Sequence, residues 1–288
     1  MEHLTLKEQK DSGAHYTPVA LSDFLAYQTT SLWRKINNIN DIDEINFLDP
    51  SVGDGQLLDS LINSIAEINR NRINVKGIDN DSIAIAGAKK RLGKYELKNI
   101  KLIESNFLAN LTIENDLFNK SNNDLVSDII IANPPYVRTQ NLGSKKAKIL
   151  SRKFGLSGRV DLSYPFILGI VENLKENGVA GIITSNRFML TRAGESIRKR
   201  LYKTVTIKYV WDLGDTKLFK AAVLPCILLL QKKITKYQKS FFTTVYSKEL
   251  TSKGADPKKL FNYLNNKRTG IVGIGIDNGS YEIRSGLL

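Results

Sequence analysis

The stretch INFLDPSVGDG, residues 45–55, predicts a short buried strand that runs into a tight loop with two glycines. Apolar residues recur at helical spacing over 57–68, so an amphipathic helix is expected to follow. A strand, a glycine loop and a helix in this order form a nucleotide cradle in parallel α/β sheets. Gly53 and Gly55 would let the backbone approach a ligand closely, because no Cβ intervenes. An ordinary glycine turn of an α/β fold is the alternative interpretation.

The glycine spacing and the next strand narrow the class of ligand. The loop is not G-x-G-x-x-G and no Lys-Ser/Thr follows it, which disfavours a pyrophosphate or triphosphate. The strand predicted over 75–78 ends at Asp79, whose carboxylate would accept both hydroxyls of a ribose. Asp81 is expected to cap the helix over 83–92. Loop and acid together predict an adenosine-containing cofactor without a pyrophosphate.

Strands and helices alternate along the chain, which predicts an α/β fold with a mostly parallel sheet and helices on both faces. A first helix is expected to begin with Thr17 as N-cap and Pro18 as its first residue. Other helices are expected over 164–174, ending near Asn177-Gly178, and over 195–202. Seven strands are predicted over 45–48, 75–78, 100–103, 128–132, 179–183, 207–211 and 224–230, with a weaker eighth over 241–246.

The sharpest motif is Asn133-Pro134-Pro135-Tyr136, directly after the apolar strand over 128–132. Two prolines fix φ near −65° and carry no N–H, which makes a rigid ledge with outward carbonyls. An amine held there would donate one hydrogen bond to the Asn133 side-chain oxygen and one to the Pro134 carbonyl. Two acceptors favour a tetrahedral nitrogen, whose lone pair then attacks a sulfonium methyl in line. Tyr136 would stack on the face of a base; a polar strand end with a rigid turn is the alternative.

Composition favours a polyanionic partner and a reducing compartment. The chain carries 42 Lys and Arg against 29 Asp and Glu, a net charge of +13 with a pI near 9.6, which suits phosphate contacts; a basic but unspecialised surface is the alternative. The single cysteine, Cys226, excludes an internal disulfide and a Cys-rich zinc site, and we expect no metal. No apolar run approaches the ~20 residues of a membrane span. The polar start, 1–10, shows no secretory signal, so a cytoplasmic location is expected.

These motifs resemble those of the gamma-class N6-adenine DNA methyltransferases of restriction–modification systems, the TaqI-like family with an NPPY motif. The resemblance covers roughly 13–231 in the family's motif order, and includes segments similar to its motifs at 13–18, 161–166 and 178–188. It implies a Rossmann-like class I fold and S-adenosylmethionine as cofactor. It assigns catalysis to Asn133, Pro134, Pro135 and Tyr136, stacking on the target base to Tyr136 and Phe219, and cofactor binding to Tyr16, Thr17, Pro18, Asp49, Pro50, Ser51, Gly53, Gly55, Asp79, Asn106, Phe107 and Asn133.

The chain departs from the family pattern at several positions. Asn106 stands where the family usually has an acid that accepts from the cofactor's adenine amine, and Ser185 replaces a frequent proline. Val52 and Asp54 occupy loop positions where small residues are common. Residues 1–231 would form the catalytic domain and 232–288 a C-terminal extension, the start of a truncated target-recognition domain. Only about 55 residues follow 231, fewer than the ~100 of a typical domain, so a separate specificity protein is the other source of recognition.

The expected activity is site-specific N6-methylation of an adenine flipped out of double-stranded DNA. A cognate restriction endonuclease would be a partner. Basic residues in a loop-like stretch after the catalytic motif would contact the DNA backbone: Arg138, Lys145, Lys146, Lys148, Arg152, Lys153 and Arg159. Methylation of a protein glutamine or of RNA is the closest alternative. A non-catalytic, DNA-binding methyltransferase-like subunit that needs a partner chain is the other.

Overall fold

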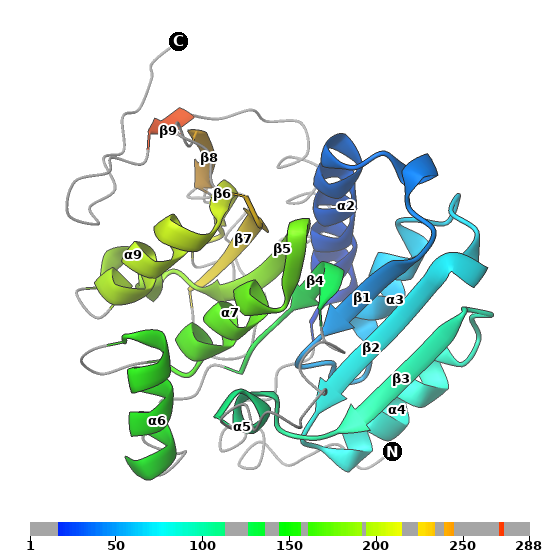
Figure 1. The fold of residues 1–288 in the computed structure, drawn as a ribbon, viewed down its shortest axis with the longest axis horizontal. Helices are drawn as coiled ribbons and strands as arrows, with labels where there is room; N and C mark the ends of the chain where they lie inside the picture. The colour runs from blue at the N-terminus through cyan, green and yellow to red at the C-terminus, as the bar shows by residue number, and fades with distance from the viewer. Residues whose placement is uncertain are drawn as a thin grey trace.

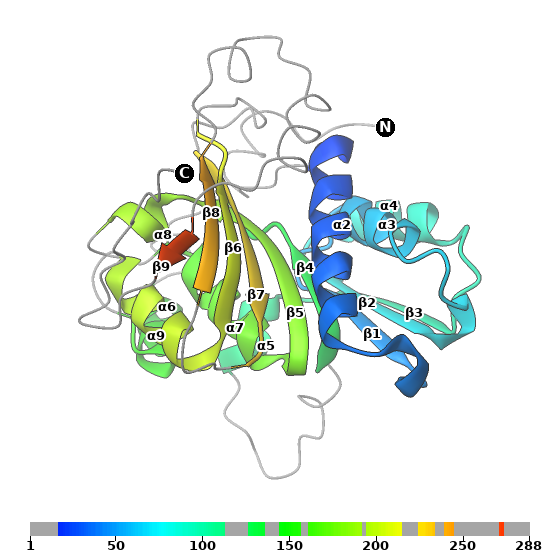
Figure 2. The ribbon, with the colours of Figure 1, turned by 90° about the horizontal axis from the view of Figure 1, so that it is seen from above.

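The computed structural model describes residues 17–112, 126–135, 144–156, 161–191, 194–214, 224–233, 239–244 and 271–273. Within these ranges, the strands form one sheet in the order β3-β2-β1-β4-β5-β7-β6-β8-β9, with helices on both faces (Figures 1 and 2). The strands are β1 (Ile45–Asp49), β2 (Ile73–Asp79), β3 (Asn99–Glu104), β4 (Ser127–Ala132), β5 (Leu174–Ser185), β6 (Thr206–Asp212), β7 (Pro225–Gln231), β8 (Lys239–Thr244) and β9 (Ile271–Gly273). The helices are α2 (Val19–Ile36), α3 (Gln56–Asn63), α4 (Ser82–Leu92), α5 (Phe107–Thr112), α6 (Ser144–Phe154), α7 (Ser163–Glu172), α8 (Arg187–Leu190) and α9 (Glu195–Thr204), with 3-10 turns at Ile39–Asp41 and Arg70–Arg72.

Strand direction confirms the predicted α/β class. From β3 to β5 every neighbouring pair is parallel, while β7 runs antiparallel between β5 and β6. The winding of the sheet reverses at β1, which lies between β2 and β4. In such sheets a ligand binds at the carboxyl ends of the strands beside this reversal. We therefore expect a ligand site among the loops that follow β1, β2 and β4.

The predicted number of seven strands was wrong, since the described residues form nine. The eighth, anticipated near 241–246, is β8, which pairs in parallel with β6, and β9 pairs antiparallel with β8. Both lie within 232–288 and continue the edge of the same sheet. A three-residue strand has too short a pattern to stand out in the sequence. The division at 231 stays a prediction.

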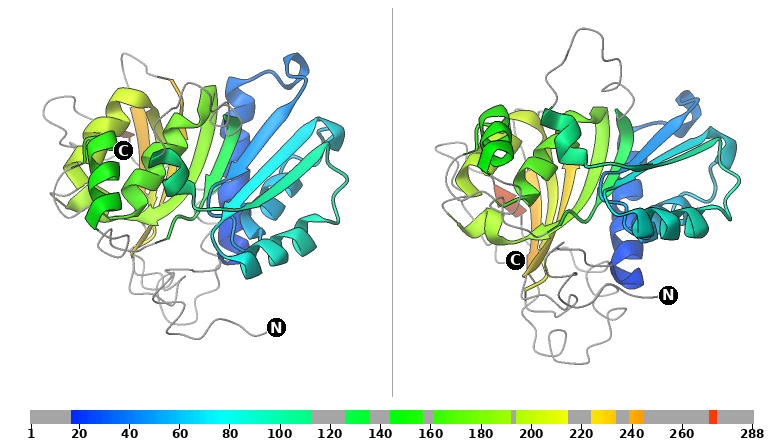
Figure 3. Two further views of the ribbon diagram at one scale, coloured as in Figure 1. Left: turned by 60° about the horizontal axis from the view of Figure 1, so that its bottom comes forward. Right: turned by 90° about the horizontal axis from the view of Figure 1, so that it is seen from below.

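Two apolar cores hold the helices to the two faces of the sheet. In β4, Ile129 and Ile131 face the core with α2, α3 and α4, while Ile130 and Ala132 face the core with α5, α6, α7 and α9. Figure 3 shows from two further sides that the blue helix α2 and the green helices α6 and α7 lie on opposite faces. A strand buried on both faces reads as a continuous apolar run, as β4 does. Cys226 of β7 is a buried free thiol within the sheet's core.

Helix α2 crosses the middle of the sheet in close contact with β5. A Cβ added at Gly181 of β5 would lie 2.1 Å from the Thr29 hydroxyl and 2.9 Å from a Leu25 methyl, so only glycine admits the helix at this distance. Leu21 and Leu25 are fully buried there. This packing fixes where α2 begins, above the carboxyl end of the sheet's central strands (Figure 2).

Several predicted boundaries were wrong. Pro18 is the N-cap of α2 with ψ 140, so the helix begins at Val19. Helix α3 ends at Asn63 instead of 68, and α7 ends at Glu172. Asn177, with φ 60, lies inside β5, at the irregularity where the register with β4 shifts. The stretch expected to be a loop contains α6, which is tethered by the buried Leu150 and Phe154, four residues apart.

Candidate active site

Two hydrogen bonds tie the loop after β1 to the carboxyl end of β2, and a third ties the residue after β3 to the same strand end. The Val52 N–H donates to the Ile78 carbonyl (2.9 Å), the Gly53 N–H to the Asp79 carboxylate (2.9 Å), and the Ser105 N–H to the Asp79 carbonyl (2.8 Å). These contacts keep the loop at the edge of the sheet beside the reversal point. The predicted strand–loop–helix unit is therefore present, with its backbone fixed.

Both glycines of the loop have positive φ, 52° at Gly53 and 84° at Gly55, a region that side chains rarely adopt. The two glycines differ in what a side chain at each position would meet. A Cβ at Gly55 would lie 3.2 Å from the α4 backbone at Ala88, whereas a Cβ at Gly53 would meet nothing within 4 Å. Gly55 thus lets α3 and α4 pack closely, and Gly53 presents open space on the loop, as expected of a backbone that receives a ligand.

Asp49 at the end of β1 is fully buried, and its carboxylate is only partly hydrogen-bonded. Its Oδ1 accepts from the Ser51 N–H (2.9 Å), and its Oδ2 has no hydrogen-bond partner among the described residues. Burial raises the pKa of Asp49 to about 8, and the nearby charge of Asp79 adds to the rise. Such a buried acceptor is costly unless a ligand or water satisfies it.

Asp79 at the end of β2 is half-buried. One of its oxygens accepts from the Gly53 N–H and the other from the Asp81 N–H (3.1 Å). Each carboxylate oxygen has two lone pairs, so beyond the Gly53, Asp81 and Asn80 N–H groups this carboxylate retains capacity for a further donor. Burial raises its pKa, and the Gly53 and Asp81 hydrogen bonds oppose that rise. Asp81 caps α4 through the Ile83 N–H, as predicted.

Asn133, directly after β4, is oriented by a residue 116 positions earlier. Its Nδ2 donates to the Thr17 hydroxyl oxygen at 3.1 Å. This bond places the donor end of the amide toward α2 and the oxygen end on the other side. Pro134 is buried and Pro135 half-buried. Thr17 is itself buried, and Pro18 caps the helix without a side-chain bond, so Thr17 serves Asn133 and not the N-terminus of α2.

Asn106 and Phe107 both have roles within the fold. The Asn106 Oδ1 accepts from the Ala109 N–H (3.0 Å), which caps α5, a frequent role for Asn. Phe107 is 2% exposed, and its ring lies 5.3 Å from that of Phe166. Their predicted contacts with the cofactor stay predictions.

The basic residues after the NPPY motif differ in what their side chains contact. Lys148 and Arg152 are exposed on α6. Lys153 instead donates to the Leu111 carbonyl (2.7 Å) at the end of α5 and pairs with Glu172 (3.5 Å) of α7. It therefore ties three helices together. Outside the described residues lie Tyr16, Tyr136, Arg138, Arg159 and Phe219, and the side chains of Lys145 and Lys146.

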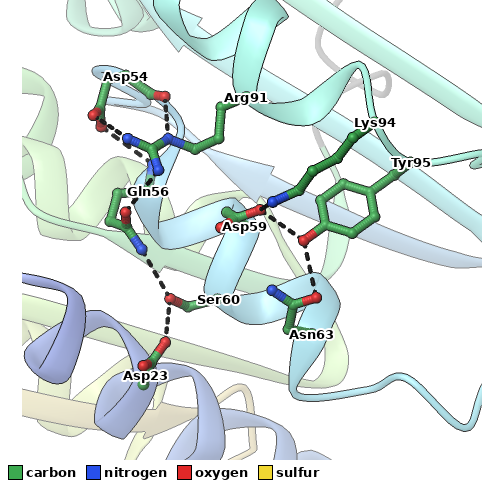
Figure 4. A network of polar contacts seen from close by, with 9 residues as sticks. All are labelled: Asp23, Asp54, Gln56, Asp59, Ser60, Asn63, Arg91, Lys94 and Tyr95. Atoms are coloured by element: carbon green, nitrogen blue, oxygen red, sulfur yellow. Dashed lines mark hydrogen bonds and ion pairs between the residues drawn. The ribbon is translucent and has the colours of Figure 1, made fainter.

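The sequence did not point to a polar network beside the glycine loop (Figure 4). Arg91 of α4 reaches Asp54 of the loop and Gln56 of α3. The only hint was that Asp54 occupies a position where small residues are common. A second such contact is buried between the ends of β5 and β6, where Asn186 donates to Asp212 (3.3 Å).

Membrane spans and metal clusters are both absent from the described residues. In the placed part of the chain, no helix is long and apolar enough to cross a membrane. Over the same ranges, no three side chains among His, Cys, Asp and Glu gather to hold a metal ion.

Comparisons with known proteins agree with the fold and the motifs. The family model described as Eco57I restriction-modification methylase matches residues 29–219. The type II methyltransferase M.BanIII of Aneurinibacillus aneurinilyticus is 38% identical over 300 residues, which cover 100% of this chain and 51% of the relative. M.BstVI of Geobacillus stearothermophilus is 30% identical, over 88% of this chain and 48% of its own length. The chain thus spans about half the length of these curated relatives.

A solved structure supports the same class of fold. A Listeria monocytogenes protein assigned to the class I S-adenosylmethionine-dependent methyltransferases matches with a TM-score of 0.61 at 20% identity, covering 91% of this chain and 75% of that one. At this identity the likeness concerns the fold alone.

Proposed function

This chain belongs to the Eco57I restriction-modification methylase family, and from that premise we propose that it methylates the exocyclic amine of adenine in DNA, with S-adenosylmethionine as methyl donor. The observation that carries the proposal is the oriented Asn133 amide on a proline ledge, at the sheet edge that also bears the glycine loop. The family supports a restriction–modification role, while adenine and the individual site residues are inferred from local chemistry.

The cofactor's chemistry fits the acceptors present. Asp79 would accept from a ribose hydroxyl with its remaining lone pair, and the open side of Gly53 would receive the ligand against the backbone. The buried Asp49 Oδ2 would take a donor, and a cation would relieve its raised pKa. When bound, S-adenosylmethionine supplies an electrophilic methyl group. Pro50, Ser51, Gly55 and Pro18 support this surface through the backbone, and Tyr16, Asn106 and Phe107 are proposed as further contacts.

The protein's part in the reaction is to hold and orient the amine. The Asn133 Oδ1 and the Pro134 carbonyl would each accept one amine N–H, which turns the nitrogen lone pair toward the methyl group. Thr17 fixes the amide so that its oxygen, and not its NH2, serves as acceptor. Orientation of this kind contributes roughly 7–11 kcal/mol to lowering a barrier. After transfer, the cationic amine loses a proton to water, so no strong base is needed.

Access to the amine requires that the adenine leave the duplex. Tyr136 and Phe219 are proposed to stack on the extruded base. The +13 charge of the chain favours a nucleic acid over a protein substrate. The exposed Lys148 and Arg152 of α6, with Arg138, Lys145 and Lys146, are candidates for phosphate contacts, whereas Lys153 is engaged within the fold.

Sequence recognition is proposed to lie outside the catalytic domain. Residues 1–231 would form the catalytic domain, and 232–288 would lead into a target-recognition part or bind a separate specificity protein. A cognate restriction endonuclease is the expected partner. This chain matches about half the length of the curated relatives, which supports the assignment of catalysis and sequence recognition to different parts of the protein.

The test is incubation of the chain with radiolabelled S-adenosylmethionine and separate pools of double-stranded DNA, RNA and protein, followed by nucleoside analysis. Label in N6-methyladenine is expected. The Asn133→Ala variant should lose transfer and keep cofactor binding, because Asn133 contacts the amine. Asn37→Ala is the matched control, since Asn37 donates to the Trp33 carbonyl within the fold. Label in RNA or glutamine, or full activity of Asn133→Ala, would overturn the proposal.

A further inference from the structure

Arg91 of α4 binds three acceptors at the junction of the glycine loop and α3 (Figure 4). Its Nε donates to the Asp54 carbonyl (2.9 Å), its Nη2 to the Asp54 carboxylate (2.5 Å), and its Nη1 to the Gln56 side-chain oxygen (2.9 Å). A planar guanidinium fits three acceptors in fixed directions, which an ammonium does not. Arg91 thus grips both the backbone and the side chain of one loop residue.

The hydrogen bonds of Arg91 matter to the loop because of how α3 begins. The N-cap of α3 is Gly55, which has no side chain to satisfy the first N–H groups of the helix. The Asp54 Oδ1 accepts from the Gln56 N–H instead, at 3.3 Å. With φ positive at Gly53 and Gly55, on either side of Asp54, the backbone has unusual freedom at this point. The hydrogen bonds of Val52 and Gly53 hold the first half of the loop to β2, and Arg91 holds Asp54 in its second half.

The hydrogen bonds of Arg91 connect through Gln56 to further polar residues of α3 and α2. The Gln56 Nε2 donates to the Ser60 hydroxyl (3.3 Å), and the Ser60 hydroxyl donates to Asp23 of α2 (2.7 Å). One polar chain therefore joins α4, the loop, α3 and α2. Helix α2 follows directly after Thr17, the partner of Asn133.

We propose that Arg91 is a positioning residue that holds the glycine loop in its cofactor-binding conformation. The inference rests on the proposed function, because it concerns the loop's affinity for S-adenosylmethionine. Loss of the guanidinium raises the cofactor's Kd about tenfold, the equivalent of roughly one hydrogen bond to a charged group. The kcat at saturating cofactor is unchanged, since Arg91 does not touch the amine ledge.

The experiment compares Arg91→Met with Arg72→Met in the full chain. Arg72 is the matched control: it is also half-buried and donates to two backbone carbonyls, Asp43 (3.2 Å) and Ile39 (2.9 Å), before β2 at the opposite end of the sheet. Both substitutions should lower Tm. Only Arg91→Met should raise the Kd for S-adenosylmethionine in calorimetry and speed hydrogen exchange of the loop amides without cofactor. Arg91→Lys, which keeps the charge but not the fork, should recover only part of the affinity.

Asp54→Asn is the second variant, for use if Arg91→Met does not fold, and should raise the Kd by a smaller factor because a neutral amide still accepts one bond. Equal cofactor Kd values for wild type and the Arg91 or Asp54 variants would overturn the inference alone. An equal rise in Arg72→Met would do the same, since it would indicate a global effect. No binding of S-adenosylmethionine by the wild type would overturn the proposed function, and the inference with it.

Discussion

Replacement of Asp49 by Asn should flatten the dependence of folding stability on pH. Burial raises the folded-state pKa of this carboxyl from 3.8 to about 8, so the folded state holds a proton that the unfolded state has released. The stabilisation of the folded state by this proton is complete at pH values below the pKa of the unfolded state. It is lost as the pH rises through the pKa of the folded state. The loss is about 1.4 kcal/mol per pH unit between roughly pH 4 and pH 8. The full span is of order 5 kcal/mol, an upper limit because a protein relaxes around a buried charge.

Urea denaturation of wild type and Asp49→Asn at a series of pH values measures this effect, since other titrations cancel in the difference. Relative to wild type, the variant should gain stability steadily from about pH 5 to pH 8 and level off above it. Asp43→Asn, an exposed position just before β1, is the control and should follow wild type. A constant difference between Asp49→Asn and wild type across this range would refute the argument that Asp49 is buried and uncompensated. Bound S-adenosylmethionine should reduce the effect, because a nearby cation favours the ionised carboxylate.

Four further substitutions test the site and the core. Thr17→Val removes the acceptor of the Asn133 amide, so single-turnover methyl transfer should slow by about tenfold with little change in Tm; an unchanged rate would contradict the orienting role. Gly55→Ala should lower the free energy of unfolding by roughly 2 kcal/mol or more, from positive φ and contact with α4, in urea denaturation. Gly53→Ala, its comparison, should cost only about 1 kcal/mol yet weaken cofactor binding in calorimetry, and retained affinity would argue against a ligand there. Ile130→Ala, fully buried in β4, should cost roughly 2–5 kcal/mol in the same denaturation assay.

The sequence was informative wherever a pattern was local. The apolar runs of β1, β2 and β4 each end in a polar residue, and parallel strands bring such ends to one edge. Asp49, Asp79 and Asn133 could therefore be assigned to one site from their places in the sequence alone. Helix α6 was missed because, among its described side chains, only Leu150 and Phe154 lie in the core. Two apolar positions give no clear period.

Contacts between distant residues were beyond the reach of such patterns. Thr17 has the residue type and place of an N-cap, but tertiary structure uses its hydroxyl for Asn133, 116 positions away. Arg91 looks like one of three basic residues in the last turn of α4, and only packing brings it to Asp54. Lys153 resembles a phosphate ligand in the sequence, but its ammonium group donates to the Leu111 carbonyl at the end of α5. Charge and residue type identify candidates, and the neighbours decide which of them are already engaged.

The position of α2 has a consequence for biosynthesis. Its apolar residues, Leu21, Phe24 and Leu25, share a core with Ile183 of β5 and Ile227 and Leu229 of β7. At a translation speed of roughly 5–20 residues per second, α2 leaves the ribosome some tens of seconds before its last partner strand is made. During that interval the part of its apolar face that packs against β5 and β7 lacks its native cover, although α3 and β4 are already made. A nascent chain of this protein is thus a natural client for ribosome-associated chaperones, and stalling before β7 should favour aggregation.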